Sequence, residues 1–249
     1  MKRGIPWDAS FLHFLIGANM SVYIHGGLRT PIGVLNGQYR NMRPEMLGAQ
    51  LINELINRYD ISQVDGIFCG NAVGTGGNIG RLMGLMTNLP NSVPAITVDM
   101  QCASALMSIE MAYTHIASGV MDSAIAGGIE SSSLQPDRMY AAGDNREGLY
   151  KVAQFSPNDC SPLAMLEGAE RTIQKHNVLK EDLYPYIIGS HQRAIEALDN
   201  PYLQSYIMPI TIDGKACVDE CIRPKMNEKL LSRMKPLLGP NAITNAGNA

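Results

Sequence analysis

The sequence predicts an α/β fold, with a mostly parallel sheet and helices on both of its faces. Short apolar or β-branched runs alternate with longer segments of helical periodicity between residues 22 and 126. This alternation is typical of βαβ units, whose connecting helices cover the faces of a parallel sheet. Beyond residue 131 the chain becomes rich in serine, proline, glycine and asparagine, which predicts a long irregular region, and two helices are expected after it, at 163–176 and 183–198.

The first half of the predicted core contains two strands and two helices. The elements are a strand at 22–25, a helix at about 45–58, a strand at 66–69 and a helix at 82–89. Leu47, Leu51 and Leu55 recur at helical spacing after Pro44. The glycine-rich stretch at 74–80 lacks the Gly-Lys-Ser/Thr of a phosphate-binding loop, so a turn is the better interpretation.

The second half of the core is organised around Cys102. Residues 95–98 predict a strand, and the spacing of Leu106, Ile109, Tyr113 and Ile116 predicts a helix that presents these residues on one face. A further strand is expected at 123–126 and is followed by two glycines. Cys102 therefore falls at the turn between a strand and a helix. Parallel sheets carry their sites at this edge.

A cysteine at such a turn has two interpretations. The unpaired N–H groups and the positive end of the helix dipole favour a nucleophilic thiolate, and the Cys102 N–H can donate to an oxyanion. The alternative is an inert, buried cysteine that opens a core helix. Position and periodicity alone leave the two equally weighted.

Several short motifs, in order along the chain, resemble those of the thiolase family of acyl-CoA acyltransferases. They are Arg29-Thr30-Pro31-Ile32-Gly33, Cys69-Gly70-Asn71-Ala72-Val73, Gln101-Cys102-Ala103-Ser104-Ala105-Leu106, Ala126-Gly127-Gly128-Ile129-Glu130-Ser131, the stretch 165–170, Asp219-Glu220-Cys221-Ile222-Arg223-Pro224 and Thr244-Asn245-Ala246-Gly247-Asn248-Ala249. The resemblance begins at Val22 and runs to Ala249. It implies the thiolase-like fold with an inserted loop domain.

The chain departs from the family pattern in two ways. Ala103 and Ala105 stand where the family usually has glycine or serine and then glycine, which either narrows the acyl pocket or repacks it. The sequence also stops at Ala249, so we expect the C-terminal half of a thiolase to be missing. With it would go the activating histidine and the second cysteine of the family.

The resemblance implies an enzyme that transfers an acyl group through a cysteine thioester to or from CoA, making or cleaving 3-ketoacyl-CoA. Cys102 would be the catalytic nucleophile. Met165 would be a wall residue of the substrate site, and the alternative is a core methionine. Arg223 is a candidate for a CoA phosphate, since Arg suits such contacts, and the alternative is a solvated surface charge. CoA and acyl-CoA would be substrates, with no further cofactor. The resemblance also implies a role in acetyl-CoA and fatty acid metabolism and assembly as a dimer or tetramer.

Four domain segments are expected. Residues 1–20 would be an extension outside the core, 21–130 the α/β core, 131–240 the loop domain and 241–249 a return to the core. Residues 11–16 only loosely imitate a signal peptide, since the apolar run is short and His13 interrupts it.

The composition limits the classes of partner that we expect for this protein. The chain has 249 residues and a net charge of -3, which gives no support for nucleic-acid binding, and no apolar run approaches a membrane span. The five cysteines form no CxxC pair or zinc pattern, so we expect no metal site. An odd number of cysteines suits a reducing compartment, and we expect a cytoplasmic protein.

Two other functions remain open. The first is a catalytically incomplete thiolase-like protein that at most binds acyl-CoA and leaves one apolar face uncovered. The second, ranked lower, is a cysteine hydrolase or thiol-redox protein, for which no supporting His or Asn motif or resolving cysteine is present.

Overall fold

The computed structural model describes residues 21–74, 77–150, 152–154, 157 and 161–248. The chain divides into two compact units, which we call the core unit and the second unit. The core unit consists of residues up to 136 together with 208–217, and the second unit of 137–207 with 218–249. The extension expected at residues 1–20 lies outside the described residues.

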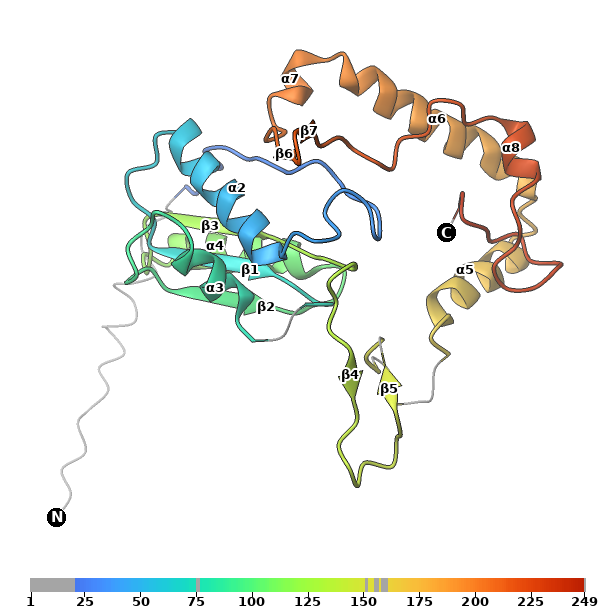
Figure 1. Ribbon diagram of the computed structural model, residues 1–249, viewed down its shortest axis with the longest axis horizontal. Coiled ribbons are helices and arrows are strands. Elements are labelled where there is room, and N and C mark those ends of the chain that lie inside the picture. Colours follow the sequence, from blue (N-terminus) through green and yellow to red (C-terminus); the bar gives the residue numbers. More distant parts are fainter. Residues whose placement is uncertain (1–20, 75–76, 151, 155–156, 158–160, 249) are drawn as a thin grey trace. The chain divides into compact units, whose positions relative to one another are not determined.

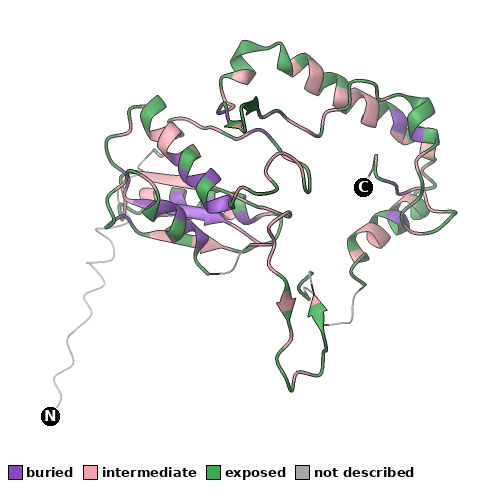
Figure 2. Cartoon of the chain, in the orientation of Figure 1, coloured by how far each residue is buried: buried purple, intermediate pink, exposed green. Residues whose placement is uncertain are grey.

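The core unit contains a parallel three-stranded sheet, as the sequence predicts. Its strands are β1 (Gly66–Gly70), β2 (Ala95–Val98) and β3 (Ala124–Gly128), in the order β2-β1-β3. All five residues of the central strand β1 are buried, which Figure 2 shows as a continuous buried stretch. A fully buried apolar strand is typical of a parallel sheet covered on both faces.

Helices cover both faces of this sheet. The helices are α2 (Pro44–Arg58), α3 (Ile79–Leu85) and α4 (Ser104–Ala117) (Figure 1). Ile67 and Cys69 of β1 belong to one buried cluster with Ile79 and Met83 of α3. Phe68 points to the opposite face, where its ring lies 5.0 Å from that of His115 in α4. The predicted α/β class is therefore confirmed.

The strand predicted at 22–25 is wrong. These residues form no strand, and the side chains of Tyr23 and Ile24 are 82% and 89% exposed. A strand requires a neighbour for its backbone N–H and C=O groups, and none of the described strands pairs with this segment. A short apolar run favours a strand, but it contains no information on whether a neighbouring strand is available to pair with it.

The helix predicted at 82–89 is shifted towards the N-terminus and ends earlier, as α3. The side chain of Asn78 accepts a hydrogen bond from the N–H of Arg81 and so starts the helix at Ile79. Gly80 and Gly84 lie against the strands, and a Cβ on Gly80 would come within 3.0 Å of the Cys69 Cβ. Glycines on the packed face hide the helical period from the sequence.

Helix α4 packs on the sheet with its small residues. Ser104, Ser108 and Ala112 are buried, whereas Leu106, Ile109 and Tyr113 are 68%, 47% and 57% exposed. The residues predicted to share an apolar face do share one, and that face is exposed in the described part of the chain.

Residues 208–217 complete the core unit. They contain the hairpin of β6 (Thr211–Ile212) and β7 (Lys215–Ala216), whose turn places Asp213 and Gly214 at positive φ. Met208 and Ile210 pack against Leu47 of α2.

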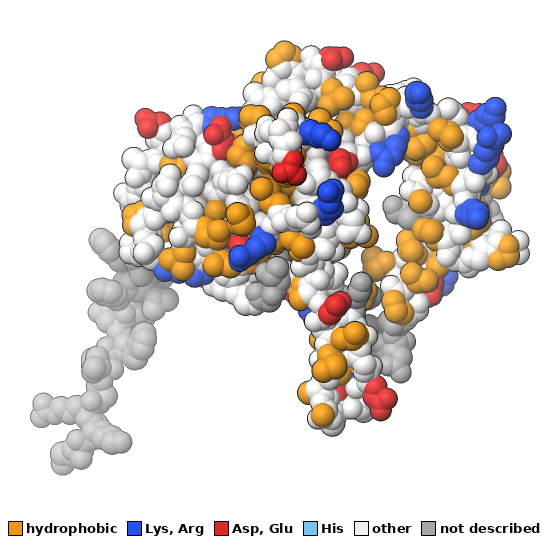
Figure 3. Space-filling model, in the orientation of Figure 1, with side chains coloured by type: hydrophobic (Ala, Val, Ile, Leu, Met, Phe, Trp, Pro, Cys, Tyr) orange, Lys and Arg blue, Asp and Glu red, His pale blue; other side chains and the backbone are white. Residues whose placement is uncertain are grey.

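The second unit is mostly helical. Its elements are the antiparallel pair β4 (Arg138–Met139) and β5 (Leu149–Tyr150), α5 (Ala164–Lys175), α6 (Lys180–Leu198), α7 (Pro201–Gln204) and α8 (Glu228–Ser232). Helices expected at 163–176 and 183–198 are present as α5 and α6. Figure 3 shows hydrophobic side chains on the surface of the β4–β5 hairpin, where Met139 and Leu149 are exposed.

The two compact units differ from the expected domain segments in three places. The division falls after residue 136, residues 208–217 belong to the core unit, and the described residues from 241 onwards belong to the second unit. These units describe packing within this chain, so the boundaries at 20, 130 and 240 stay predictions.

Candidate active site

Cys102 lies in the turn between β2 and α4, after the carboxyl end of β2. Figure 1 shows β2 and α4 in the core unit. Its thiol is exposed to solvent, and helix α4 begins two residues later at Ser104. This exposure contradicts the expectation of a buried cysteine, whereas the reactivity of the thiol stays a prediction. The catalytic role of this residue stays a prediction at this point.

The turn before the thiol is sharp. Gln101 has φ +53°, the left-handed region that a residue with a side chain rarely adopts. Its N–H donates to the Asp99 carboxylate at 2.9 Å, and its C=O accepts from both the N–H and the hydroxyl of Ser104, at 3.1 and 2.6 Å. The Ser104 oxygen in turn accepts the N–H of Met100 at 2.8 Å.

One N–H donor of the turn, that of Cys102, takes no part in these hydrogen bonds. They use the N–H groups of Met100, Gln101, Ala103 and Ser104, and none of those described uses the N–H of Cys102. An N–H beside a nucleophile is the type of donor that stabilises an oxyanion.

Glycines allow the start of α4 to approach the strand ends. A Cβ on Gly70 would lie 2.5 Å from the backbone N of Ala105, and one on Gly128 would lie 3.1 Å from the Ala105 Cβ. The Ala105 methyl group thus lies towards Gly128, at the carboxyl ends of β1 and β3.

Glu130 fixes the loop that follows β1. Its carboxylate accepts hydrogen bonds from the N–H groups of Ala72, Val73 and Gly74, at 2.5, 3.2 and 3.4 Å. A carboxylate that accepts hydrogen bonds from three backbone N–H groups fixes the conformation of a loop, so Glu130 has a structural role.

Cys69 shows the opposite environment to Cys102. Its thiol is buried in the core cluster, and burial, together with the negative charge of Glu130, raises its pKa to about 11. Such a thiol stays protonated and inert near neutral pH.

Three of the described histidines, His25, His115 and His191, have side-chain contacts with other parts of the chain. The His115 Nδ1–H donates to the Met111 C=O at 2.7 Å, and His25 contacts the ring and the C=O of Tyr59. None of the hydrogen bonds recorded for the described residues joins a histidine to the Cys102 thiol. Among the residues that the structure describes, no group of three or more His, Cys, Asp or Glu side chains could hold a metal ion.

The predicted substrate residues lie in the second unit. Met165 is 74% exposed near the start of α5, so it is not a core residue within the described structure. Arg223 donates through Nη1 to the C=O groups of Glu220 and Ile222, and its N–H donates to His191 Nδ1 at 3.2 Å. A guanidinium has five N–H donors, so these contacts leave donors for a phosphate.

A buried carboxylate joins two of the sequence motifs. Glu170 of α5 accepts the N–H and the hydroxyl of Thr244, at 2.9 and 2.6 Å, and the N–H of Ile243 at 3.1 Å. Burial by itself raises the pKa of Glu170, but the hydrogen bonds from Thr244 and Ile243 outweigh it and lower the pKa below its usual value. The sequence offered no sign of this contact, because it spans 74 residues.

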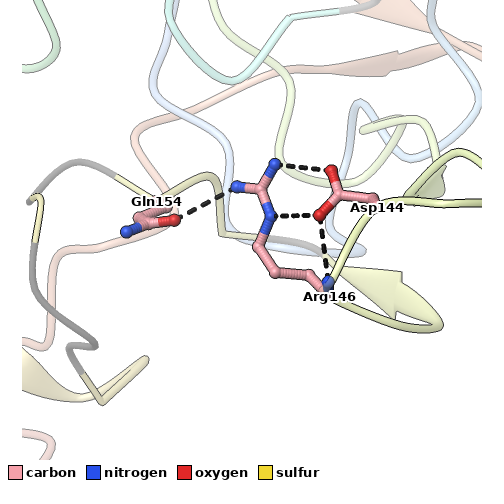
Figure 4. A network of polar contacts seen from close by, with 3 residues as sticks. All are labelled: Asp144, Arg146 and Gln154. Atoms are coloured by element: carbon pink, nitrogen blue, oxygen red, sulfur yellow. Dashed lines mark hydrogen bonds and ion pairs between the residues drawn. The ribbon is translucent and has the colours of Figure 1, made fainter.

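A polar network lies on the β4–β5 hairpin (Figure 4). The Arg146 guanidinium binds both carboxylate oxygens of Asp144, at 2.9 and 2.7 Å, and donates to Gln154 at 3.1 Å. These hydrogen bonds lower the pKa of Asp144 to about 2. Arg146 also lies over the Tyr140 ring, 4.3 Å from its centroid, beside a hollow of about 320 Å³. None of the sequence motifs described above contains these residues.

Within the described residues, none of the helices combines the length and the apolar character that a membrane crossing requires.

Comparison with known proteins gives a consistent result. Residues 22–249 match the family model described as "Thiolase, N-terminal domain". Two relatives named "Putative acetyl-CoA C-acetyltransferase VraB" are 32% identical over 227 residues in Staphylococcus aureus (strain MW2) and 33% identical over 228 residues in Staphylococcus haemolyticus. These alignments cover 88% and 89% of this chain but only 60% and 59% of the relatives, so the chain spans about three fifths of their length.

A solved structure resembles the fold as a whole. The crystal structure of the Bacillus anthracis acetyl-CoA acetyltransferase superposes with a TM-score of 0.79 at 24% sequence identity. The superposition covers 91% of this chain and 61% of that one.

Proposed function

The chain belongs to the thiolase family, and from that premise we propose that it transfers acyl groups between CoA thioesters through Cys102. The observation that carries the proposal is the exposed thiol at a sharp strand–helix turn. A nucleophile at such a turn is accessible from solvent and lies beside backbone N–H donors.

The first step would load the cysteine. The Cys102 thiolate attacks the carbonyl carbon of an acyl-CoA, the bond to the CoA sulfur breaks, and CoA thiolate leaves and takes up a proton. The acyl group remains as a thioester on Cys102. We propose that the Cys102 N–H, which the described hydrogen bonds of the turn do not use, donates to the transient oxyanion.

The second step would form a carbon–carbon bond. A second acyl-CoA loses a proton from its α-carbon, and the carbanion attacks the thioester on Cys102. The product is a 3-ketoacyl-CoA, and Cys102 leaves as a thiolate. The reverse sequence cleaves 3-ketoacyl-CoA with CoA. The base that removes the α-proton is not assigned to any described residue.

The proposal includes the substrates and the setting. Acyl-CoA and CoA are the substrates, with no further cofactor, and Met165 and Arg223 contact them. The protein acts as a cytoplasmic homo-oligomer, a dimer or tetramer, in acetyl-CoA or fatty acid metabolism.

The alternative function is binding of acyl-CoA without turnover. One observation favours it: none of the hydrogen bonds of the described histidines reaches the Cys102 thiol. Under this alternative Cys102 acquires no acyl group.

Intact-protein mass after incubation with acetyl-CoA separates the two functions. The wild type is expected to gain one acetyl group, Cys102→Ser none, and Cys221→Ser, which removes another exposed cysteine, the wild-type amount. A folded wild type that stays unmodified contradicts acyl transfer, and binding of CoA by calorimetry then tests the alternative.

The substrate contacts have their own test. Arg223→Ala is expected to raise the acetyl-CoA concentration that gives half-maximal loading of Cys102 by roughly tenfold, since a charged hydrogen bond contributes about 1.5–3 kcal/mol. Lys215→Ala, in the β6–β7 hairpin of the core unit, is the control. Equal loading curves for the two variants exclude a contact between Arg223 and CoA.

A further inference from the structure

The Ser104 hydroxyl makes two of the hydrogen bonds that hold the turn at Cys102, beside the bond from the Gln101 N–H to the Asp99 carboxylate. The φ of +53° at Gln101 costs on the order of 1–3 kcal/mol, and such a conformation persists only when surrounding contacts enforce it. Of the side chains that contact the turn, the Ser104 hydroxyl makes two hydrogen bonds, to the Gln101 C=O and the Met100 N–H. Ser104 itself is only 5% exposed.

These contacts are not those of an ordinary helix cap. A capping serine accepts hydrogen bonds from N–H groups further along the helix. The Ser104 hydroxyl instead bonds backwards, to residues three and four positions before it. It therefore holds the segment that precedes the helix, and Cys102 lies inside the loop that these two bonds close.

We propose that Ser104 is a positioning residue, whose buried hydroxyl holds the Met100–Gln101 backbone so that the Cys102 thiol and N–H face the same acyl carbonyl. This inference rests on the proposed function. The hydroxyl donates to the Gln101 C=O and accepts from the Met100 N–H, so it has no part in the chemistry itself.

Removal of the hydroxyl has a specific consequence. In Ser104→Ala the Met100 N–H loses its acceptor and the Gln101 C=O loses one of its two donors. The turn then relaxes towards other conformations. Acyl transfer needs the thiol and the oxyanion donor together, whereas alkylation by iodoacetamide needs only an accessible thiol. The ratio of the two rates therefore reports the geometry of the turn.

The same helix offers a matched control. Ser108 lies one turn later on the same buried face, is 0% exposed, and contacts the C=O groups of Ala105 and Gly127 at 2.7 and 2.9 Å. Ser108→Ala also removes a buried hydroxyl from α4, but it leaves the hydrogen bonds of the turn intact. Comparing the two variants separates positioning from a general loss of stability.

The experiment uses two readouts on the wild type, Ser104→Ala, Ser104→Thr and Ser108→Ala. The first is amide hydrogen exchange of the peptide that contains residues 99–103. The second is the rate of Cys102 acetylation by acetyl-CoA divided by its rate of alkylation by iodoacetamide, both from peptide mass spectrometry. Cys221 alkylation in the same samples is the internal reference.

Ser104→Ala is expected to increase exchange at Met100 and to lower the rate ratio about tenfold or more, because small misplacements of reacting groups are costly. Ser104→Thr, which keeps a hydroxyl, is expected to retain most of the ratio, and Ser108→Ala all of it. Equal exchange and equal ratios for Ser104→Ala and Ser108→Ala overturn the inference. If the wild type acquires no acetyl group, the proposed function fails, and the exchange comparison alone decides whether Ser104 holds the turn.

Discussion

Two cysteines of the core unit differ in their environment, although both follow or belong to strands of the same sheet. Cys69 points into the cluster beneath α3, and Cys102 lies in an exposed turn. We therefore expect burial of the thiol to decide which of the two cysteines reacts, because both are close to the same sheet. This difference can be measured without any substrate.

Alkylation of the native protein at pH 8 is expected to modify Cys102 and to spare Cys69. With a pKa of about 11, only about one Cys69 in a thousand is a thiolate at this pH, and the side chain is buried as well. Peptide mass spectrometry after a short treatment with iodoacetamide measures both sites. The control is the unfolded protein, in which both react, and modification of Cys69 as fast as Cys102 in the folded state contradicts the structure.

Glu170 gives a prediction on the dependence of stability on pH. Its pKa is lower when folded than when unfolded, so its stabilising effect is present above the unfolded value of about 4.3 and is lost as the pH falls through the folded value. Glu170→Gln is expected to lower the free energy of unfolding by about 1–3 kcal/mol at pH 7, since charge-assisted hydrogen bonds are lost. The difference between the two proteins should shrink below pH 4.

Glu167→Gln, one turn earlier on α5, is the control, and chemical denaturation at several pH values is the measurement. A constant difference between wild type and Glu170→Gln from pH 7 to pH 3 would show that the carboxylate charge contributes nothing.

At the scale of elements, the close contact between α4 and the strands depends on glycines, which have no side chain. Gly70 and Gly128 leave room for Ala105, and α4 turns Ser104, Ser108 and Ala112 towards the sheet. This close approach places the start of the helix at the strand ends, where Cys102 lies.

Gly70→Ala is therefore expected to destabilise the core unit. The added methyl group would lie 2.5 Å from the Ala105 N and 2.6 Å from the Ser104 C, which are backbone atoms and cannot rotate away. We expect a loss of about 1–3 kcal/mol, typical of overpacking, together with slower loading of Cys102. Gly127→Ala is the matched control, since its Cβ would meet nothing within 4 Å. Thermal unfolding compares the two, and equal midpoints contradict the close packing described here.

The sequence predicted most strands and helices of the core, and the place of Cys102, because local periodicity and turn residues determine them. It did not predict which face of α4 is buried, because serines and an alanine pack on the sheet while Leu106 and Tyr113 remain exposed. The false strand at 22–25 and the contact between Glu170 and Thr244 depend on pairing between distant parts of the chain. Periodicity within a short window contains no information on such pairing.

At the scale of the whole molecule, the exposed face of α4 affects association. Leu106, Ile109 and Tyr113 present large apolar side chains to solvent in the described structure, and such patches promote self-association. We expect this chain to associate in a concentration-dependent manner. The double variant Leu106→Glu with Tyr113→Glu should be more monomeric, as measured by sedimentation velocity.

Tyr186→Glu, which changes an exposed tyrosine of α6, is the control. A wild type that remains monomeric at high micromolar concentration, or a double variant that associates equally, excludes this face as the cause.

The contact between Glu170 and Thr244 can form only after the ribosome has synthesised both residues. The two residues are 74 positions apart, so a ribosome that adds about 5–20 residues per second needs roughly 4–15 s to synthesise the interval. The strands of the sheet are synthesised earlier, because the last of them, β3, ends at Gly128. During synthesis the strands that support Cys102 can therefore pair while the carboxylate of Glu170 is still without the groups that later surround it.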